Sequence, residues 1–325
     1  MEYKIVIMGL NMDIGILIQI VLLLIGFLFL IKGSDFFVDG SSSIASILKI
    51  PTIIVGLTIV AFGTSAPEAA VSITSSFTGN NALAVSNVIG SNLFNMLVVI
   101  GVGALLSNLL MEEIVLKRDL PFLLAITLLL SAFIILGWNI TPIEGIILII
   151  ILAIYIYYLI KDARNSDAAD YVEKPKYTTP KSIILIIVGV CGIILGGNLV
   201  VDSASYIALA FGMSETLVGL TIVAIGTSLP ELVTSITAIR KGENQLLIGN
   251  VIGSNIFNIL FVLGASSAIS TITLDSSLLF DVILMIAVTV ICYIFGKTQN
   301  KYSKKEGAVL LLIFIAYMAF AILRN

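Results

Sequence analysis

Two glutamates stand at matching places inside long apolar stretches of this 325-residue chain. Glu68 ends the run Gly-Thr-Ser-Ala-Pro-Glu, and Glu231 ends the run Gly-Thr-Ser-Leu-Pro-Glu. A charged carboxylate in the apolar core of a membrane costs roughly 2.5–3.5 kcal/mol on insertion scales. A lone glutamate at such a place can simply be neutral and hydrogen-bonded, whereas an identical pair predicts a shared task, and cation binding is the chemistry that suits it.

Two hydroxyl residues precede each glutamate by four and three positions: Thr64 and Ser65 in the first run, Thr227 and Ser228 in the second. In a helix these spacings place the hydroxyls on the face of the carboxylate. The proline in each run removes an N–H and clashes with the carbonyl four residues back, so carbonyls near Ala61 to Gly63 are expected to lose their helical partners. Such carbonyls are tolerated at membrane depth only under cover of protein or water, and they can bind cations.

A second repeated run supplies more oxygen atoms. It reads NVIGSNLFN over 87–95 and NVIGSNIFN over 250–258, and it places a serine and an asparagine four residues apart on one helix face. These residues are Ser91 with Asn95, and Ser254 with Asn258. Ser and Asn also hold membrane helices together, so a purely structural role is the alternative. As ligands they would complete an all-oxygen set, which suits Na⁺ and Ca²⁺ better than small, rigid Mg²⁺.

The composition excludes other chemistry. The chain has no histidine, and its two cysteines stand alone in apolar segments, so sites for soft metals and Ser/His catalysis are excluded. Neither a serine with a base nor an aspartyl pair is spaced for an intramembrane hydrolase, and we expect no enzyme activity. The net charge of −3, with no long basic run, argues against nucleic acid as a partner. With 59% hydrophobic and 11% charged residues, the chain is expected to have the lipid bilayer as its solvent.

The elements that must position these groups are membrane spans. The polar breaks predict ten, near 14–32, 52–76, 82–106, 120–137, 142–160, 182–201, 214–238, 245–269, 278–296 and 306–323. A charged linker over 161–181 divides them into an N-terminal half (1–160) and a C-terminal half (182–325) of five spans each. This plan places 15 of the 17 Lys and Arg residues on one side, which the positive-inside rule makes cytoplasmic. The linker is then cytoplasmic, and both termini are extracellular.

The two halves contain one repeat. Residues 33–102 align without a gap on 196–265, at an offset of 163, and about half of the positions are identical. Because each half has an odd number of spans, the second copy enters the membrane in the opposite sense. Phe77 and Thr78 of the first copy correspond to Arg240 and Lys241 of the second. Positive charge therefore occurs on the predicted cytoplasmic side and is not repeated at the equivalent positions of the other copy. The predicted fold is therefore all-α and integral to the membrane, with ten transmembrane helices in two inverted five-helix repeats and interrupted helices at the midplane.

At these residues the chain resembles the sodium/calcium exchanger family of the cation/calcium antiporter superfamily. The resemblance rests on G-T-S-x-P-E followed by G-S-N-x-x-N in each half, about 140 residues in two blocks. It implies a four-helix core that holds the ions, with long first and sixth spans sliding across it. It also implies a ligand set: Glu68 and Glu231 as central ligands, hydroxyls or carbonyls of Thr64, Ser65, Thr227 and Ser228, backbone oxygens of Ala61 and Ala224, Ser91 and Ser254 beside sodium sites, and Asn95 and Asn258 lining the centre.

One departure from the family pattern bears on mechanism. Several members carry an aspartate at the position of Asn95 or Asn258, whereas this chain has only two acidic groups in the expected set. We expect secondary active exchange of Na⁺ for Ca²⁺ by a functional monomer, with no cofactor besides the transported ions, and electrogenic if three Na⁺ exchange for one Ca²⁺. Ca²⁺/H⁺ exchange or K⁺-dependent exchange through the same glutamates is the alternative, and a channel is disfavoured by the inverted repeat.

Overall fold

Long apolar helices make up most of this chain, because in a bilayer the backbone polar groups must be satisfied within each segment. The computed structural model describes residues 4–7, 10–79, 81–165, 174–213, 218, 222, 224–273 and 278–324. Within these ranges eight helices are long and apolar enough to span a membrane, and a bent helix pair makes a ninth if it is taken as one span. The predicted seventh span, 214–238, lies partly outside the described residues, so the count of ten remains a prediction.

The helices follow the order of the predicted spans. They are α1 (Ile14–Leu48), α2 (Thr52–Val55), α3 (Ala61–Thr64), α4 (Ala66–Phe77), α5 (Asn81–Phe94), α6 (Ile100–Leu106), α7 (Leu120–Gly137), α8 (Pro142–Asn165), α9 (Thr179–Ala210), α11 (Ala224–Gly226), α12 (Leu229–Arg240), α13 (Asn244–Phe257), α14 (Gly264–Ile269), α15 (Leu279–Gln299) and α16 (Lys304–Arg324). Among the segments that the structure describes, these π-helical ones join some of the helices: η1 (Gly56–Val60), η2 (Asn95–Val99), η3 (Val115–Asp119) and η6 (Asn258–Leu263).

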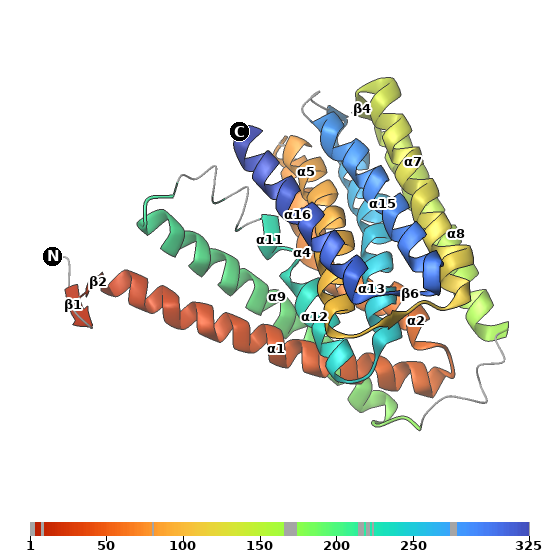
Figure 1. Ribbon diagram of the computed structural model, residues 1–325, viewed down its shortest axis with the longest axis horizontal. Helices are drawn as coiled ribbons and strands as arrows, with labels where there is room; N and C mark the ends of the chain where they lie inside the picture. Colours follow the sequence, from red (N-terminus) through yellow and green to blue (C-terminus); the bar gives the residue numbers. More distant parts are fainter. Residues whose placement is uncertain are drawn as a thin grey trace.

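Helices α1 and α9 form a long pair that is inclined to the other helices (Figure 1). These helices have 35 and 32 residues and are longer than the predicted spans 14–32 and 182–201, which ended at the first polar residues. The helix in fact continues through Lys32, Asp35 and Asp39, because nothing there breaks it. Gly33 and Gly196 let the two backbones approach closely: a Cβ on Gly196 would lie 2.6 Å from the backbone nitrogen of Leu30.

Helices α5 and α13 belong to the interior of the bundle. Of the most apolar 18 residues in Leu83–Leu106, 83% are buried, and in Asn244–Ile269 the share is 94%, against 11% in α1. Both helices pass into π-helical segments, η2 and η6, which begin at equivalent asparagines of the repeat. Single π turns inside helices are frequent at functional sites because they rotate the side chains that follow.

Short strands join loops on the two ends of the bundle. In the described part of the chain these are three antiparallel pairs, an addition to the helical prediction: β1 (Lys4–Ile7) with β2 (Leu10–Asp13), β3 (Leu109–Leu110) with β6 (Lys301–Tyr302), and β4 (Asn139–Ile140) with β5 (Ile272–Thr273). The last two pairs tie a loop of the first half to a loop of the second.

Candidate cation-binding site

Each glutamate lies in the first turn of a helix that starts after a break. Helix α3 ends at Thr64 and α4 starts at Ala66, with a bend of 50° between the two parts of the span. Proline stands in the first turn of α4, where its missing N–H is least costly. Glu68 lies in that first turn, and Glu231 lies in the first turn of α12. A carboxylate is favoured at this position because helix N-termini carry a partial positive charge.

The break frees fewer carbonyls than the sequence predicts. The Ala61 carbonyl accepts the backbone N–H of Ser65 at 3.0 Å, so the prediction that it loses its helical partner is wrong. Ser65 can donate this bond because it still lies one helical turn beyond Ala61. The carbonyl of Gly63 has no such partner four residues on, where Pro67 has no N–H. In the second copy Ala224 is the first residue of α11, and Ser228 donates its N–H to the carbonyl of Ile225 at 3.1 Å.

The serines of the two runs bind the opposite glutamates. Ser65 donates its hydroxyl to Glu231 Oε1 at 2.9 Å, and Ser228 donates to Glu68 Oε1 at 3.1 Å. The sequence predicted each hydroxyl on the face of its own carboxylate. The bend at Ser65 (φ −83°, ψ 8°) and at Ser228 (φ −94°, ψ 5°) interrupts the helical spacing on which that prediction rested. All four side chains are buried, and the two carboxylates lie close enough to repel each other electrostatically.

The threonines cross between the repeats in the same way. Thr64 donates to Asn250 Oδ1 at 3.0 Å, and Thr227 donates to Asn87 Oδ1 at 3.5 Å. Each of these asparagines also donates to a serine of its own repeat, Asn87 to Ser72 at 2.9 Å and Asn250 to Ser235 at 3.3 Å. Sequence reasoning did not single out Asn87 and Asn250, although both stand at the head of the repeated NVIGSN run.

The two serines of that run lie beside the glutamates. Ser91 donates to Glu68 Oε1 at 3.4 Å. Ser254 lies 3.4 Å from the Thr64 hydroxyl and contacts Glu231. The predicted residues Glu68, Glu231, Thr64, Ser65, Ser228, Ser91 and Ser254 therefore form one buried oxygen-rich cluster.

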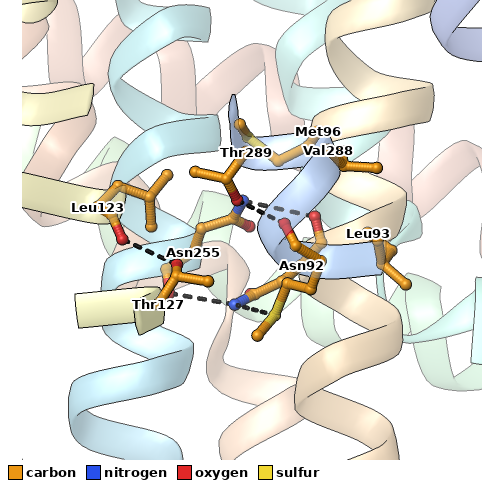
Figure 2. Close-up of a pocket in the computed structure, with 9 residues that line it drawn as sticks. Asn92, Leu93, Met96, Leu123, Thr127, Asn255, Val288 and Thr289 are labelled. Carbon is orange, nitrogen blue, oxygen red and sulfur yellow. Dashed lines mark hydrogen bonds between the residues drawn. The ribbon is translucent and has the colours of Figure 1, made fainter. Parts of the chain in front are cut away.

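Asn95 and Asn258 are held by two further asparagines that the sequence reasoning missed. Asn95 donates to Asn255 Oδ1 at 3.1 Å, and Asn258 donates to Asn92 Oδ1 at 3.2 Å. Figure 2 shows Asn92 and Asn255 turned toward each other from neighbouring helices, beside Thr127, whose hydroxyl bonds its own helix. The signal for Asn92 and Asn255 was present in the sequence, since they are the asparagine of G-S-N in each copy.

Four buried oxygens of these residues have no hydrogen-bond partner in the described part of the chain: Oε2 of Glu68, Oε2 of Glu231, Oδ1 of Asn95 and Oδ1 of Asn258. They form two pairs related by the repeat. Leaving a buried polar atom unpaired is costly, and each such atom needs an explanation. Among the described residues no three Cys, His, Asp or Glu side chains gather as a conventional metal site. The arrangement instead offers two carboxylates with hydroxyl and amide oxygens, a set that suits hard cations.

Apolar helices around a buried polar cluster built from two copies of one repeat define a multi-pass membrane transporter. The chain matches the family model described as sodium/calcium exchanger protein over residues 18–161 and 181–323. The chain belongs to this family, as the resemblance of its two repeated motifs predicted.

Individual relatives cover almost the whole chain. The provisionally named antiporter CaxA of Alkalimonas amylolytica is 39% identical over 312 residues, which cover 93% of this chain and 98% of the relative. The sodium/calcium exchanger MaX1 of Methanosarcina acetivorans is 32% identical, with 93% of this chain and 98% of the relative covered. The solved structure of the sodium-calcium exchanger NCX_Mj superposes with a TM-score of 0.84 at 29% identity, covering 94% of this chain and 98% of that chain.

Proposed function

We propose that this protein, a cation/calcium antiporter by family, exchanges Na⁺ for Ca²⁺ across the membrane by alternating access. The observation that carries the proposal is the set of four unpartnered buried oxygens, on Glu68, Glu231, Asn95 and Asn258. A transported cation that binds there gives each of them a partner. The hydroxyls of Thr64, Ser65, Thr227, Ser228, Ser91 and Ser254 and the backbone oxygens of Ala61 and Ala224 complete the proposed ligand set.

Charge balance makes the two ions competitors for the cluster. One Ca²⁺ balances the two glutamates, and so do two Na⁺, because each carboxylate carries one negative charge. A third Na⁺ leaves one net positive charge, so exchange of three Na⁺ for one Ca²⁺ moves one charge per cycle. That charge is worth about 2.3 kcal/mol per 100 mV, which favours calcium extrusion from a cell with a negative interior.

Access alternates when α1 and α9 move as one unit across the cluster. Their close packing supports movement as one unit, because glycines allow the backbones of the two helices to contact each other. Both glutamates come from one chain, and the cluster needs no second copy, which supports a functional monomer.

The proposed topology has ten spans as two inverted repeats, with halves 1–160 and 182–325, a cytoplasmic linker at 161–181 and both termini extracellular. Contacts between loops support it. Strand β3 pairs with β6, and the plan places both loops inside, whereas β4 pairs with β5, and the plan places both outside. Lys176 of the linker contacts Asp39 at 3.3 Å, and the bond raises the pKa of Lys176.

Single cysteines test this topology in a variant that lacks Cys191 and Cys292. Lys305 and Thr271 are exposed and lie on opposite predicted sides. In intact cells a membrane-impermeant maleimide should label Thr271→Cys and spare Lys305→Cys, which should react only after permeabilisation. Equal labelling of both in intact cells would contradict the proposed sides.

Ion flux in proteoliposomes tests the exchange itself. With the membrane potential clamped, an outward Na⁺ gradient should drive ⁴⁵Ca²⁺ uptake, and Glu68→Gln or Glu231→Gln should abolish it. Glu113→Gln is the matched control, because this glutamate is exposed and lies outside the cluster. Uptake driven by a pH gradient without Na⁺ would establish Ca²⁺/H⁺ exchange, and uptake that requires K⁺ would establish K⁺-dependent exchange. Flux at the wild-type rate in both glutamine variants would remove the proposed ligands.

A further inference from the structure

Four buried asparagines form a crossed network where α5 and α13 pass into their π-helical segments. Asn95 donates to Asn255 Oδ1 at 3.1 Å, and Asn258 donates to Asn92 Oδ1 at 3.2 Å. Asn92 and Asn255 then donate to each other's backbone carbonyls, both at 3.4 Å. The two bonds are equivalent by the repeat: adding the offset of 163 to Asn95 gives Asn258, and subtracting it from Asn255 gives Asn92.

Asn92 and Asn255 form the inner pair of this network, and Asn95 and Asn258 form the outer pair. The hydrogen bonds determine whether the oxygen or the NH₂ group of each outer side chain points away from the inner pair. A backbone carbonyl can only accept, so Asn255 must direct its NH₂ at the carbonyl of Asn92 and its Oδ1 at Asn95. Asn95 must then direct its NH₂ at Asn255, which leaves its own Oδ1 facing away from that contact. If the Asn95 amide flipped, two acceptor oxygens would face each other. The mirrored chain runs from the carbonyl of Asn255 through Asn92 to Asn258.

The oxygens at the ends of these two series of hydrogen bonds, Asn95 Oδ1 and Asn258 Oδ1, are buried and have no partner among the described residues. Asn92 and Asn255 have no such free oxygen, since each Oδ1 accepts the amide of the opposite repeat. The inner pair therefore differs from the outer pair in role, although all four residues are of one type. A cation requires an oxygen, and an NH₂ group in the same place would repel it.

We propose that Asn92 and Asn255 are positioning residues that act across the repeats, each fixing the amide of the opposite outer asparagine so that it presents oxygen to the transported ion. This rests on the proposed function, in which Asn95 and Asn258 are ion ligands. Asn92 acts through Asn258, and Asn255 acts through Asn95. Neither inner asparagine touches the ion.

Double-mutant cycles test this crossed pattern, with ⁴⁵Ca²⁺ equilibrium binding to the purified full-length protein as the readout. The crossed cycles combine Asn92→Ala with Asn258→Ala, and Asn255→Ala with Asn95→Ala. The matched controls combine the same inner variants with the outer asparagine of their own helix: Asn92→Ala with Asn95→Ala, and Asn255→Ala with Asn258→Ala. Each inner variant also loses its bond to a backbone carbonyl, and the controls contain the same loss.

The crossed pairs should show a coupling of about fivefold in Kd, the weight of one buried hydrogen bond, and the same-helix pairs should be additive within about twofold. Additive crossed pairs, or equal coupling in both kinds of pair, would overturn the proposal. The outer single variants test the function on which it rests: if Asn95→Ala and Asn258→Ala both bind Ca²⁺ as the wild type does, these residues are not ligands. If an alanine variant does not elute as a folded protein, serine replaces alanine in the same cycle, because serine is too short to reach the opposite amide.

Discussion

Gly196 and Gly197 are neighbours on α9 that meet very different surroundings. A Cβ on Gly196 would lie 2.6 Å from the backbone nitrogen of Leu30 and 2.7 Å from the backbone oxygen of Gly26. A Cβ on Gly197 would lie 3.6 Å from Pro230, which is ordinary contact. Alanine at either position gains the same intrinsic helix propensity, about 1 kcal/mol over glycine. The two variants therefore differ only in what the added methyl group meets.

Gly196→Ala should force α1 and α9 apart. Ordinary contact begins near 3.4 Å, so the backbones must separate by about 0.8 Å at this point. Backbone atoms cannot rotate aside as a side chain can, and overpacking of this kind costs about 1–3 kcal/mol. On a scale of about 2–4 °C per kcal/mol, we expect Gly196→Ala to melt a few degrees below Gly197→Ala.

Thermal unfolding of both purified variants in the same detergent measures the difference. Gly197→Ala should melt at or slightly above the temperature of the wild type, because it gains propensity without a clash. Equal melting temperatures for the two variants would refute the argument, since the close approach of α1 and α9 at Gly196 would then carry no energetic weight.

Two further predictions concern polar groups. Arg118 binds the fully buried carboxylate of Asp119 at 2.7 Å, so Arg118→Met should destabilise the protein by about 3–5 kcal/mol and lower its melting temperature strongly. Its neighbour Lys117 is 74% exposed, and Lys117→Met is the control that should leave the melting temperature nearly unchanged; similar losses for both would contradict a buried ion pair. Ser65→Ala removes the hydroxyl that binds Glu231 at 2.9 Å and should weaken ⁴⁵Ca²⁺ binding about tenfold. Ser76→Ala removes a hydroxyl that donates to the Ser72 carbonyl of its own helix at 3.1 Å and should not weaken Ca²⁺ binding; equal binding by the two variants would exclude Ser65 as a functional group.

The glutamates could be identified from the sequence because their signal is local. A carboxylate in an apolar run is rare. Its recurrence in the same motif, at an offset of 163, argues against a structural accident. The proline that precedes each glutamate predicted a break, and the span that contains Glu68 is indeed bent there by 50°. Span ends were less predictable: α1 continues to Leu48 although the polar residues from Lys32 onward suggested an end, because a helix tolerates charge wherever the side chain can reach a partner.

The partners of these groups could not be read from the sequence. Helical spacing assigned Ser65 to Glu68, whereas the fold pairs it with Glu231, 166 residues away. The same holds for Thr64 with Asn250, and for Asn95 with Asn255. Periodicity describes which residues share a face of one helix, and it contains no information on which face of another helix lies opposite.

The sequence by itself determined the solvent of this chain, its repeat, and the residue types of the cluster, because hydrophobicity and duplication are written in the order of the residues. The tertiary structure alone decided that each repeat completes the polar cluster of the other, with serines, threonines and asparagines bonded crosswise. The physical reason is that two copies packed face to face each bring their broken helix against the opposite copy. A polar side chain buried at that boundary then finds its nearest partner across it.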